Sequence, residues 1–248
     1  MINLLNCGLF SYCKDDKKEN QDSIMPPMSL GHGYLFAIAD GVGAYEGAKE
    51  ASLLAINYLS KLAPDEIADI DSVFISIKNQ LSNLRELNSK FNRSATTLTF
   101  CYISNRNVHI GHIGDTRVYV RKESKLVQLS KDHTVHQELF DEGLFTKKEL
   151  KELDGKNTLT SALSRVVELQ YQKICVPVSE VISKEGTLDI YIMSDGAHYF
   201  WEKRPRFSLN TLKNPVRFAA SLQRRIDKDG PVDDYSLVAT KFLISKDQ

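Results

Sequence analysis

Two apolar stretches far apart in the chain end in the same way, on an aspartate followed by a glycine. The first, Tyr34–Gly43, reads YLFAIADGVG, and the second, Leu188–Gly196, reads LDIYIMSDG. Short apolar runs that are rich in aromatic and branched residues and stop at a turn signal are typical of buried strands. An ionised aspartate at such a position is costly unless a cation meets it. The pattern therefore predicts that Asp40 and Asp195 belong to one shared site.

Helical periodicity is present in three other stretches. Apolar residues recur at the spacing of one helix face in Ala44–Leu62 and in about Ser72–Phe91. A third amphipathic stretch, Asn214–Asp227, opens with Asn-Pro, which is a typical helix start. These stretches predict three longer helices.

Short strand-like runs make up much of the remaining chain. Turn residues such as Gly114 and Asp115 separate them, as in an antiparallel meander. We expect strands at Leu4–Phe10, Thr96–Ile103, Asn107–Ile113, Thr116–Arg121, Lys125–Leu129, Gln170–Val178, Thr187–Ser194 and Tyr235–Ile244. The two prolines and two glycines of Met25–Gly33 predict a turn region instead.

A polar excursion interrupts the strands between about residues 135 and 156. His133–Gly143 and Thr146–Leu153 have few apolar residues and predict short surface helices, and Asn157–Val166 predicts another short helix. Because hairpins join the strands and the long helices fall in two groups, we expect antiparallel sheets with covering helical layers. The fold class is α+β, in one domain over residues 1–248.

Composition changes this picture little. The chain has 248 residues, of which 42% are hydrophobic and 26% charged, and its 32 basic and 32 acidic residues cancel. This balance gives no overall field that favours nucleic acid or an anionic membrane. The N-terminus lacks a signal-peptide pattern, and no run approaches the roughly 20 apolar residues of a membrane helix. We expect a cytoplasmic protein with no nucleic-acid or membrane partner.

The cysteines give no sign of a disulfide framework or a zinc site. Cys7, Cys13, Cys101 and Cys175 show no C-x-x-C spacing, and the last two lie in strand-like runs. Buried free thiols in a reducing compartment are therefore expected. The ordinary apolar content gives no sign of a large oligomeric interface, and a monomer is expected.

Further aspartates stand at predicted strand ends or turns: Asp22, Asp115, Asp132, Asp233 and Asp234. Each of these alone is explained by hydrogen bonds to its own turn. Asp40 and Asp195 differ, because a whole apolar run leads to each. Clustered carboxylates repel one another unless a hard divalent cation neutralises them, and oxygen-only ligands favour Mg²⁺ or Mn²⁺ over Zn²⁺. The predicted chemistry is activation of a metal-bridging water for attack on a phosphoryl group.

Six short motifs occur in an informative order. They are ENQDS, ADGVG, IGDTRVY, SKDHT, SDG and VDDYSLV, and the match runs from about residue 17 to residue 242. No single motif is specific, but the series resembles the metal-dependent serine/threonine protein phosphatases of type 2C, in their compact bacterial form. The resemblance implies a four-layer α-β-β-α sandwich of two antiparallel sheets flanked by helices, with metals at one edge.

The resemblance also implies ligands for two metal ions. Asp40 matches the aspartate that bridges both metals. Asp195 and Asp233 match ligands of the first metal, and Gly41 matches the glycine whose carbonyl binds the second. The catalytic residues implied in this way are Asp40, Asp195 and Asp233.

Two more positions match outlying ligands in the family. Asp22 matches an outer or water-mediated ligand, and Asp115 matches the aspartate associated with a third, weaker metal. The excursion at about 135–156 falls where the family carries a mobile flap beside the substrate groove. Its polar, short-helix character agrees with such a flap.

The implied activity is hydrolysis of phosphoserine and phosphothreonine in proteins without a phosphoenzyme, by a water that bridges two Mn²⁺ or Mg²⁺ ions. Phosphorylated proteins would be the substrates, and a serine/threonine kinase would oppose the enzyme. Two other functions stay open: a catalytically silent relative that binds a partner, and a hydrolase of small phosphoesters. Silent relatives usually lose metal aspartates, whereas this chain keeps them.

The chain departs from the family pattern near these motifs. Lys17 stands where the family has an arginine for the substrate phosphate, so the charge is kept and the bidentate fork is lost. Lys18 could serve instead, or both could form a solvated basic turn. Gln21 replaces a common glutamate, and an amide can still hold a metal-bound water. Val42 replaces a histidine proposed as general acid in many eukaryotic members, so the leaving group needs another proton source.

The C-terminal motif leaves two alignments open. Matching on Ser236 makes Asp233 the metal ligand, and a slip of one residue makes it Asp234. His198 is close enough in sequence to Asp195 to reach the site, although a structural or incidental role is the simpler interpretation. The Asp132-His133-Thr134 motif is expected to be structural.

Basic residues dominate from Lys203 to Lys228, with Trp201 and Phe207 nearby. The stretch overlaps the predicted helix at Asn214–Asp227. A solvated helix face or a docking surface for an acidic partner explains it better than a nucleic-acid site.

Overall fold

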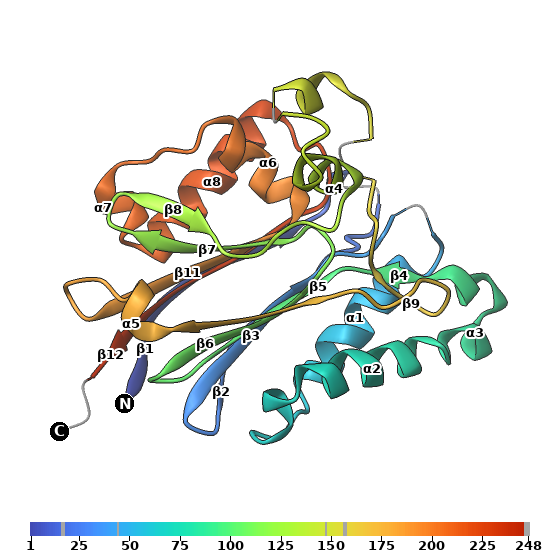
Figure 1. Cartoon of the computed structure of the whole chain (residues 1–248), viewed down its shortest axis with the longest axis horizontal. Helices are drawn as coiled ribbons and strands as arrows, with labels where there is room; N and C mark the ends of the chain where they lie inside the picture. Colours follow the sequence, from blue (N-terminus) through green and yellow to red (C-terminus); the bar gives the residue numbers. More distant parts are fainter. Residues whose placement is uncertain (16–17, 44, 147, 156–157, 246–248) are drawn as a thin grey trace.

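The computed structural model describes residues 1–15, 18–43, 45–146, 148–155 and 158–245. Two five-stranded antiparallel sheets pack face to face between helices (Figure 1). The first sheet contains, in spatial order, β1 (Ile2–Tyr12), β12 (Tyr235–Ile244), β11 (Thr187–Met193), β7 (Arg117–Lys122) and β8 (Lys125–Gln128). The second contains β10 (Gln172–Pro177), β6 (Asn107–Ile113), β5 (Leu98–Ile103), β3 (Gly33–Ala39) and β2 (Ser23–Leu30).

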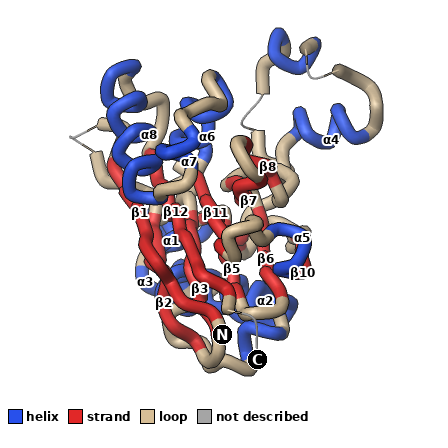
Figure 2. Tube along the Cα trace, turned by 90° about the vertical axis from the view of Figure 1, so that its left-hand side faces the viewer, coloured by secondary structure: helices blue, strands red, loops and turns tan. Residues whose placement is uncertain are grey.

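Helices cover the outer face of each sheet (Figure 2). On the second sheet lie α1 (Ala48–Leu59), α2 (Ile70–Leu81) and α3 (Leu84–Leu87), and on the first lie α6 (Asp195–Lys203), α7 (Leu209–Leu212) and α8 (Pro215–Asp229). The short elements are α4 (Val135–Asp141), α5 (Val178–Val181), the pair β4 (Ala95–Thr96) and β9 (Leu163–Ser164), and 3-10 helices at Glu66–Ala68, Ser89–Arg93 and Glu149–Glu152. The predicted four-layer α+β arrangement is confirmed.

The apolar strands are continuous runs because both of their faces are buried. In β3, Phe36 and Ile38 pack between the two sheets, whereas Leu35 and Ala37 pack under α1 and α2. In β11 the even positions from Leu188 enter the layer between the sheets, and the odd positions from Tyr191 pack against α6 and α8. A period of two places successive side chains on opposite faces, so a strand between two cores is apolar throughout.

The amphipathic helix predicted near the C-terminus is confirmed as α8. Asn214 caps it, with its side-chain oxygen accepting the Arg217 amide at 3.1 Å, and Pro215 occupies the first turn. The helix α6 was not predicted; it begins at Asp195, one residue after the end of β11, with Ser194 at its N-cap. The first turn of α6 is formed by the same Asp-Gly pair that was interpreted as a strand end and turn.

Two predicted elements were wrong. Met25–Gly33 is mostly strand β2, and its register shifts between Met25 and Met28, around the two prolines. Proline cannot donate to a strand ladder, but β2 is an edge strand, where it is tolerated. Asn157–Val166 forms no helix within its described residues, and Leu163–Ser164 pairs as β9 with β4 instead.

Three other predictions need adjustment. The helix expected over Ser72–Phe91 is divided, since α2 ends at Leu81 and α3 is a separate short helix. The described part of Thr146–Leu153 holds only a 3-10 turn. Of the four expected buried thiols, Cys101 is buried, Cys7 and Cys13 are partly exposed, and Cys175 is exposed because it lies on the solvent-facing side of β10 with Lys173. Within the described chain, no helix is long and apolar enough to cross a membrane.

Candidate metal centre

A cavity of about 150 Å³ lies where the ends of several strands meet. Asp40 follows β3 and Asp195 follows β11, while Asp115 stands between β6 and β7. Asp233 and Asp234 directly precede β12. All five carboxylates line the cavity, together with Gln21, Gly41, Val42, Gly43, Thr97 and Leu159. No basic side chain is among the lining residues that the structure describes, so the wall is strongly acidic.

The backbone of Asp40 is fixed by the start of the β4–β5 segment. Its amide donates to the Thr97 hydroxyl at 3.1 Å, and its carbonyl accepts the Thr97 amide at 2.8 Å and the Thr96 hydroxyl at 2.9 Å. Burial raises the pKa of the Asp40 carboxyl well above its ordinary value, and the neighbouring aspartates, Asp22 foremost, raise it further. Such a group needs a proton or a cation to be stable.

Asp195 is brought against the C-terminal motif by the glycine that follows it. A Cβ on Gly196 would lie 2.1 Å from the backbone oxygen of Asp234, so only glycine permits this approach. Burial raises the pKa of Asp195 to about 6, and the charge of Asp233 contributes in the same direction. The glycine of the second Asp-Gly pair therefore allows two carboxylate-bearing segments to pack closely.

Asp233 and Asp234 have different surroundings. Both carboxylate oxygens of Asp234 accept backbone amides, from Lys14 at 2.8 Å and from Gln21 at 2.7 Å. Asp233 is exposed at the cavity, and its Oδ1 accepts the Asp234 amide at 2.9 Å. Asp234 thus holds the first motif in place, and Asp233 is the better placed of the two to meet an ion.

Gly41 also packs too closely for a side chain. A Cβ there would lie 2.6 Å from the Ala48 carbonyl oxygen and 2.9 Å from that of Gln21. The Gly41 amide donates to Gln21 at 3.3 Å, which joins the first two motifs. Its carbonyl therefore belongs to a rigid segment of the cavity wall.

Asp22 lies beneath the cavity and does not line it. Its side chain is buried, and Oδ2 accepts the Ser194 hydroxyl at 2.9 Å. Oδ1 is buried with no hydrogen-bond partner within the described structure. Burial raises the pKa of Asp22 to about 7, and Asp195 and Asp234 add to the rise. This position agrees with an outer role.

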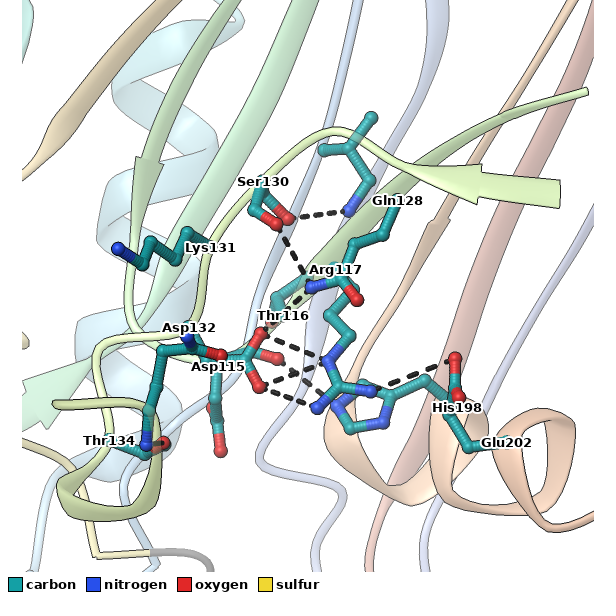
Figure 3. Close-up of polar contacts among 12 residues, drawn as sticks. Asp115, Thr116, Arg117, Gln128, Ser130, Lys131, Asp132, Thr134, His198 and Glu202 are labelled. Carbon is teal, nitrogen blue, oxygen red and sulfur yellow. Dashed lines mark hydrogen bonds and ion pairs between the residues drawn. The ribbon is translucent and has the colours of Figure 1, made fainter. Parts of the chain in front are cut away.

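The backbone of Asp115 is contacted by a histidine of α6 (Figure 3). Its carbonyl oxygen lies 3.1 Å from His198 Nε2, and since a carbonyl can only accept, that nitrogen donates. Two residues further along the chain, Nε and Nη2 of Arg117 donate to the Asp132 carboxylate at 2.6–3.0 Å. Burial raises the pKa of the Asp115 carboxyl well above its ordinary value, and the negative charges of Asp195 and Asp132 raise it further. Asp132 is structural, as expected, and His198 contacts the backbone at the site.

Two basic residues, Lys17 and Lys18, were expected near the substrate phosphate, and the structure describes only Lys18. Lys17 lies outside the described residues. Lys18 is exposed and does not line the cavity. Val42 does line it and carries no proton donor.

Sequence reasoning missed two polar residues that shape the site. Thr97 fixes Asp40, and Ser194 fixes Asp22 while also accepting the Ser236 amide at 2.9 Å. Ser194 directly precedes the second Asp-Gly pair, which was the available signal. No comparable signal marked Thr97, because threonine is common in strands.

The donor set fits a hard divalent cation. It offers carboxylate oxygens and a backbone carbonyl, which suit Mg²⁺ and Mn²⁺. In the described part of the chain, no three His, Cys, Asp or Glu side chains are already gathered closely enough to hold one ion. Mg²⁺ usually takes only one or two carboxylates and keeps several waters. The raised pKa values and the unpartnered Asp22 oxygen are the features that a nearby cation would relieve.

Comparison with known proteins places these features in context. The family model described as Protein phosphatase 2C matches residues 11–239. The serine/threonine protein phosphatase PstP of Mycobacterium tuberculosis is 29% identical over 153 residues, which are 60% of this chain and 29% of PstP. A putative protein phosphatase of Mycoplasma genitalium is 26% identical over 228 residues, 84% of each chain. This chain thus spans less than a third of the length of PstP.

Solved structures show the same fold. A crystal structure of the M. tuberculosis phosphatase PstP/Ppp superposes with a TM-score of 0.79 at 24% identity, covering 98% of this chain and all of that one. The PstP catalytic domain in complex with two manganese ions gives a TM-score of 0.75 at 24% identity with the same coverage. At this identity the likeness concerns the fold.

Proposed function

The chain belongs to the protein phosphatase 2C family, and we propose that it is a metal-dependent phosphatase that hydrolyses phosphoserine and phosphothreonine in proteins. The observation that carries the proposal is the cavity in which five carboxylates meet with no described basic side chain among them. Clustered acids with raised pKa values are a site for divalent cations. Phosphorylated proteins would be its partners, opposite a serine/threonine kinase.

Four residues would hold two Mn²⁺ or Mg²⁺ ions. Asp40 would bridge them, Asp195 and Asp233 would bind the first, and the Gly41 carbonyl would bind the second. The rigid backbone of Asp40 and the close packing at Gly196 would keep these donors in place. When bound, the ions would lower the pKa of a water for attack on phosphorus and offset charge on the phosphoryl oxygens.

Asp22 and Asp115 would act around this centre. Asp22, buried beneath the cavity, would bind through water and orient the first motif. Asp115 would belong to a third, weaker metal position, with its main chain held by His198. Lys17 would bind the substrate phosphate, in place of the arginine of the family.

A direct attack by water agrees with the residues around the cavity. Among the described lining residues, no serine, cysteine or histidine is present, and the Thr97 hydroxyl is bonded to Asp40 and Thr116. No phosphoenzyme is therefore proposed. Because Val42 cannot donate a proton, the leaving group would take its proton from solvent.

The excursion after β8 would border a protein substrate. Its two ends are tied together beside the cavity, where Val135 donates to Thr158 at 3.0 Å and Thr160 donates to His133 at 2.9 Å. Leu159, between these bonds, lines the cavity. Figure 2 shows α4 and the following segment projecting from the sheets, as expected of a flap that contacts a large substrate.

The test is hydrolysis of a phosphothreonine peptide and an aryl phosphate, with Mn²⁺ and then with chelator. We expect Mn²⁺-dependent turnover that Asp195→Ala lowers on the order of 1,000-fold. Asp65→Ala is a matched control, because Asp65 is exposed and does not line the cavity. Turnover that persists in chelator, or in Asp195→Ala, would contradict the metal mechanism.

A second pair of variants tests which C-terminal aspartate is the ligand. Asp233→Asn should abolish Mn²⁺-dependent turnover, because it removes a metal-binding charge. Asp234→Asn should keep a larger share of activity, because its amide oxygen can still accept one of the two backbone amides. The reverse ranking would assign the metal to Asp234.

A further inference from the structure

A second hollow, separate from the acidic cavity, is strongly basic. It is a groove of about 880 Å³ between the segment after α6 and the C-terminal half of α8. Six cations line this basic groove: Lys203, Arg204, Arg206, Arg224, Arg225 and Lys228. Asp229 is the only carboxylate among its described lining residues, and it is paired with Lys203 at 3.2 Å. No described residue lines both this groove and the acidic cavity.

The groove is built by one half-buried arginine. The guanidinium of Arg225 donates to the backbone carbonyls of Phe200, Arg204 and Arg206 at 2.8–3.2 Å. It also lies 4.2 Å from the centre of the Phe207 ring. These contacts fix the segment after α6 alongside α8, so the wall is held in advance and needs no ordering on binding.

The remaining cations point their charge to solvent. On α8, Arg224 and Lys228 are four residues apart and share one face with Ser221, opposite the buried Leu222 and Ile226. Arg204, Arg206, Arg224 and Lys228 are exposed, and no carboxylate of the described residues pairs with them. The pKa of Arg225 is lowered by burial and then by the charge of Arg204, whereas the charge of Asp229 acts in the opposite direction.

We propose that the basic groove binds an acidic segment of a partner protein. The chain has a net charge of zero, so the six cations of the groove do not serve solubility through an overall charge. Gathered in one groove they repel one another, and a bound anionic segment would relieve this repulsion. Arginine is suited to this task because its planar fork pairs with carboxylates in a bidentate manner.

The groove lacks the features of a single-stranded nucleic-acid site. Such sites offer aromatic faces on which bases stack. The two aromatic residues that line this groove are covered, since Phe200 is buried and the Phe207 ring lies beneath Arg225. An acidic peptide segment needs only exposed guanidinium and ammonium groups to pair with its carboxylates, and the groove presents these groups.

The experiment is a fluorescence anisotropy titration of the full chain with a labelled octaglutamate peptide. We expect saturable binding in about 0.05 M salt that weakens strongly in about 0.5 M salt, because salt screens exposed charges. The double variant Arg204→Glu/Arg224→Glu should weaken binding about tenfold or more, since each contact changes from attraction to repulsion. Arg85→Glu/Arg106→Glu is the matched control, with two exposed arginines outside the groove.

Each outcome has a defined meaning. Loss of peptide binding in the groove variant, with the control variant at wild-type affinity, supports the proposal. No binding by the wild-type chain, or equal loss in both variants, overturns it. Tighter binding of a labelled oligothymidylate through the same arginines also overturns it in favour of nucleic acid. Circular dichroism and Mn²⁺-dependent aryl phosphate turnover should match wild type in both variants, because these arginines are exposed and away from the acidic cavity.

Discussion

The buried carboxyl of Asp22 allows a quantitative test of the electrostatics of the site. Replacing it by asparagine removes a group that resists ionisation in the folded protein. In the unfolded chain the carboxyl loses its proton near its ordinary pKa, whereas in the folded chain burial holds the pKa at about 7. Between these values the folded state binds more protons, so its stability falls as pH rises. Asparagine does not ionise, so the Asp22→Asn variant does not lose this stability as pH rises.

The magnitude follows from the pKa difference. Between about pH 5 and pH 8, ionisation of Asp22 costs the metal-free wild type about 2–3 kcal/mol of folding free energy that the variant keeps. The charge of Asp22 also raises the pKa of Asp40, so removing it lowers the Asp40 pKa and further increases the stability of the variant relative to the wild type. Comparing the two proteins at each pH cancels the opposite effect of His112, whose pKa is lowered by burial to about 3. Any pH-independent effect of the asparagine on stability also drops out, because the test measures how the difference between the two proteins changes with pH.

Urea unfolding in chelator provides the assay. Trp201 is the only tryptophan and is buried, so its fluorescence reports unfolding. With a slope of about 3 kcal/mol per molar urea, the unfolding midpoint of the variant should rise by about 1 M relative to that of the wild type from pH 5 to pH 8. Asp65→Asn, at an exposed position, should gain nothing. A midpoint difference that is constant with pH, or that shrinks, would refute the reasoning.

Two further variants test the packing around the site. Gly196→Ala places a methyl group 2.1 Å from the Asp234 backbone oxygen. Turnover in steady-state kinetics should therefore fall on the order of 100-fold, and stability in urea unfolding should fall by about 1–3 kcal/mol. Wild-type turnover would show that the close approach of these segments is unimportant. Arg117→Lys keeps the charge but loses the bidentate contact with Asp132, so calorimetry should show a melting temperature lower by about 4 °C. Arg85→Lys, at an exposed position, is its control, and equal melting temperatures of all three proteins would contradict the expectation.

The layers of the fold could be predicted because their signal is local. An apolar run such as that of β3 indicates a strand buried on both faces, and the Asn-Pro pair at the start of α8 marks the N-terminus of a helix. The prolines of β2 gave the wrong answer because the sequence does not show which strand lies at a sheet edge. The helix α6 was missed because its first residues carry a turn signal, and its aromatic residues become a helix face only when packed on the first sheet.

The candidate site divides in the same way. The sequence alone determined that Asp40 and Asp195 each follow a buried apolar run and that six motifs follow the order of a phosphatase family. Only the tertiary structure decided that Asp234 is occupied by the amides of Lys14 and Gln21, and that His198 contacts the Asp115 carbonyl. The basic groove also depends on it, since Arg225 joins two segments about twenty residues apart. Periodicity and turn chemistry act between neighbours in the chain, whereas hydrogen-bond partners and exposed charge are set by which distant segments pack together.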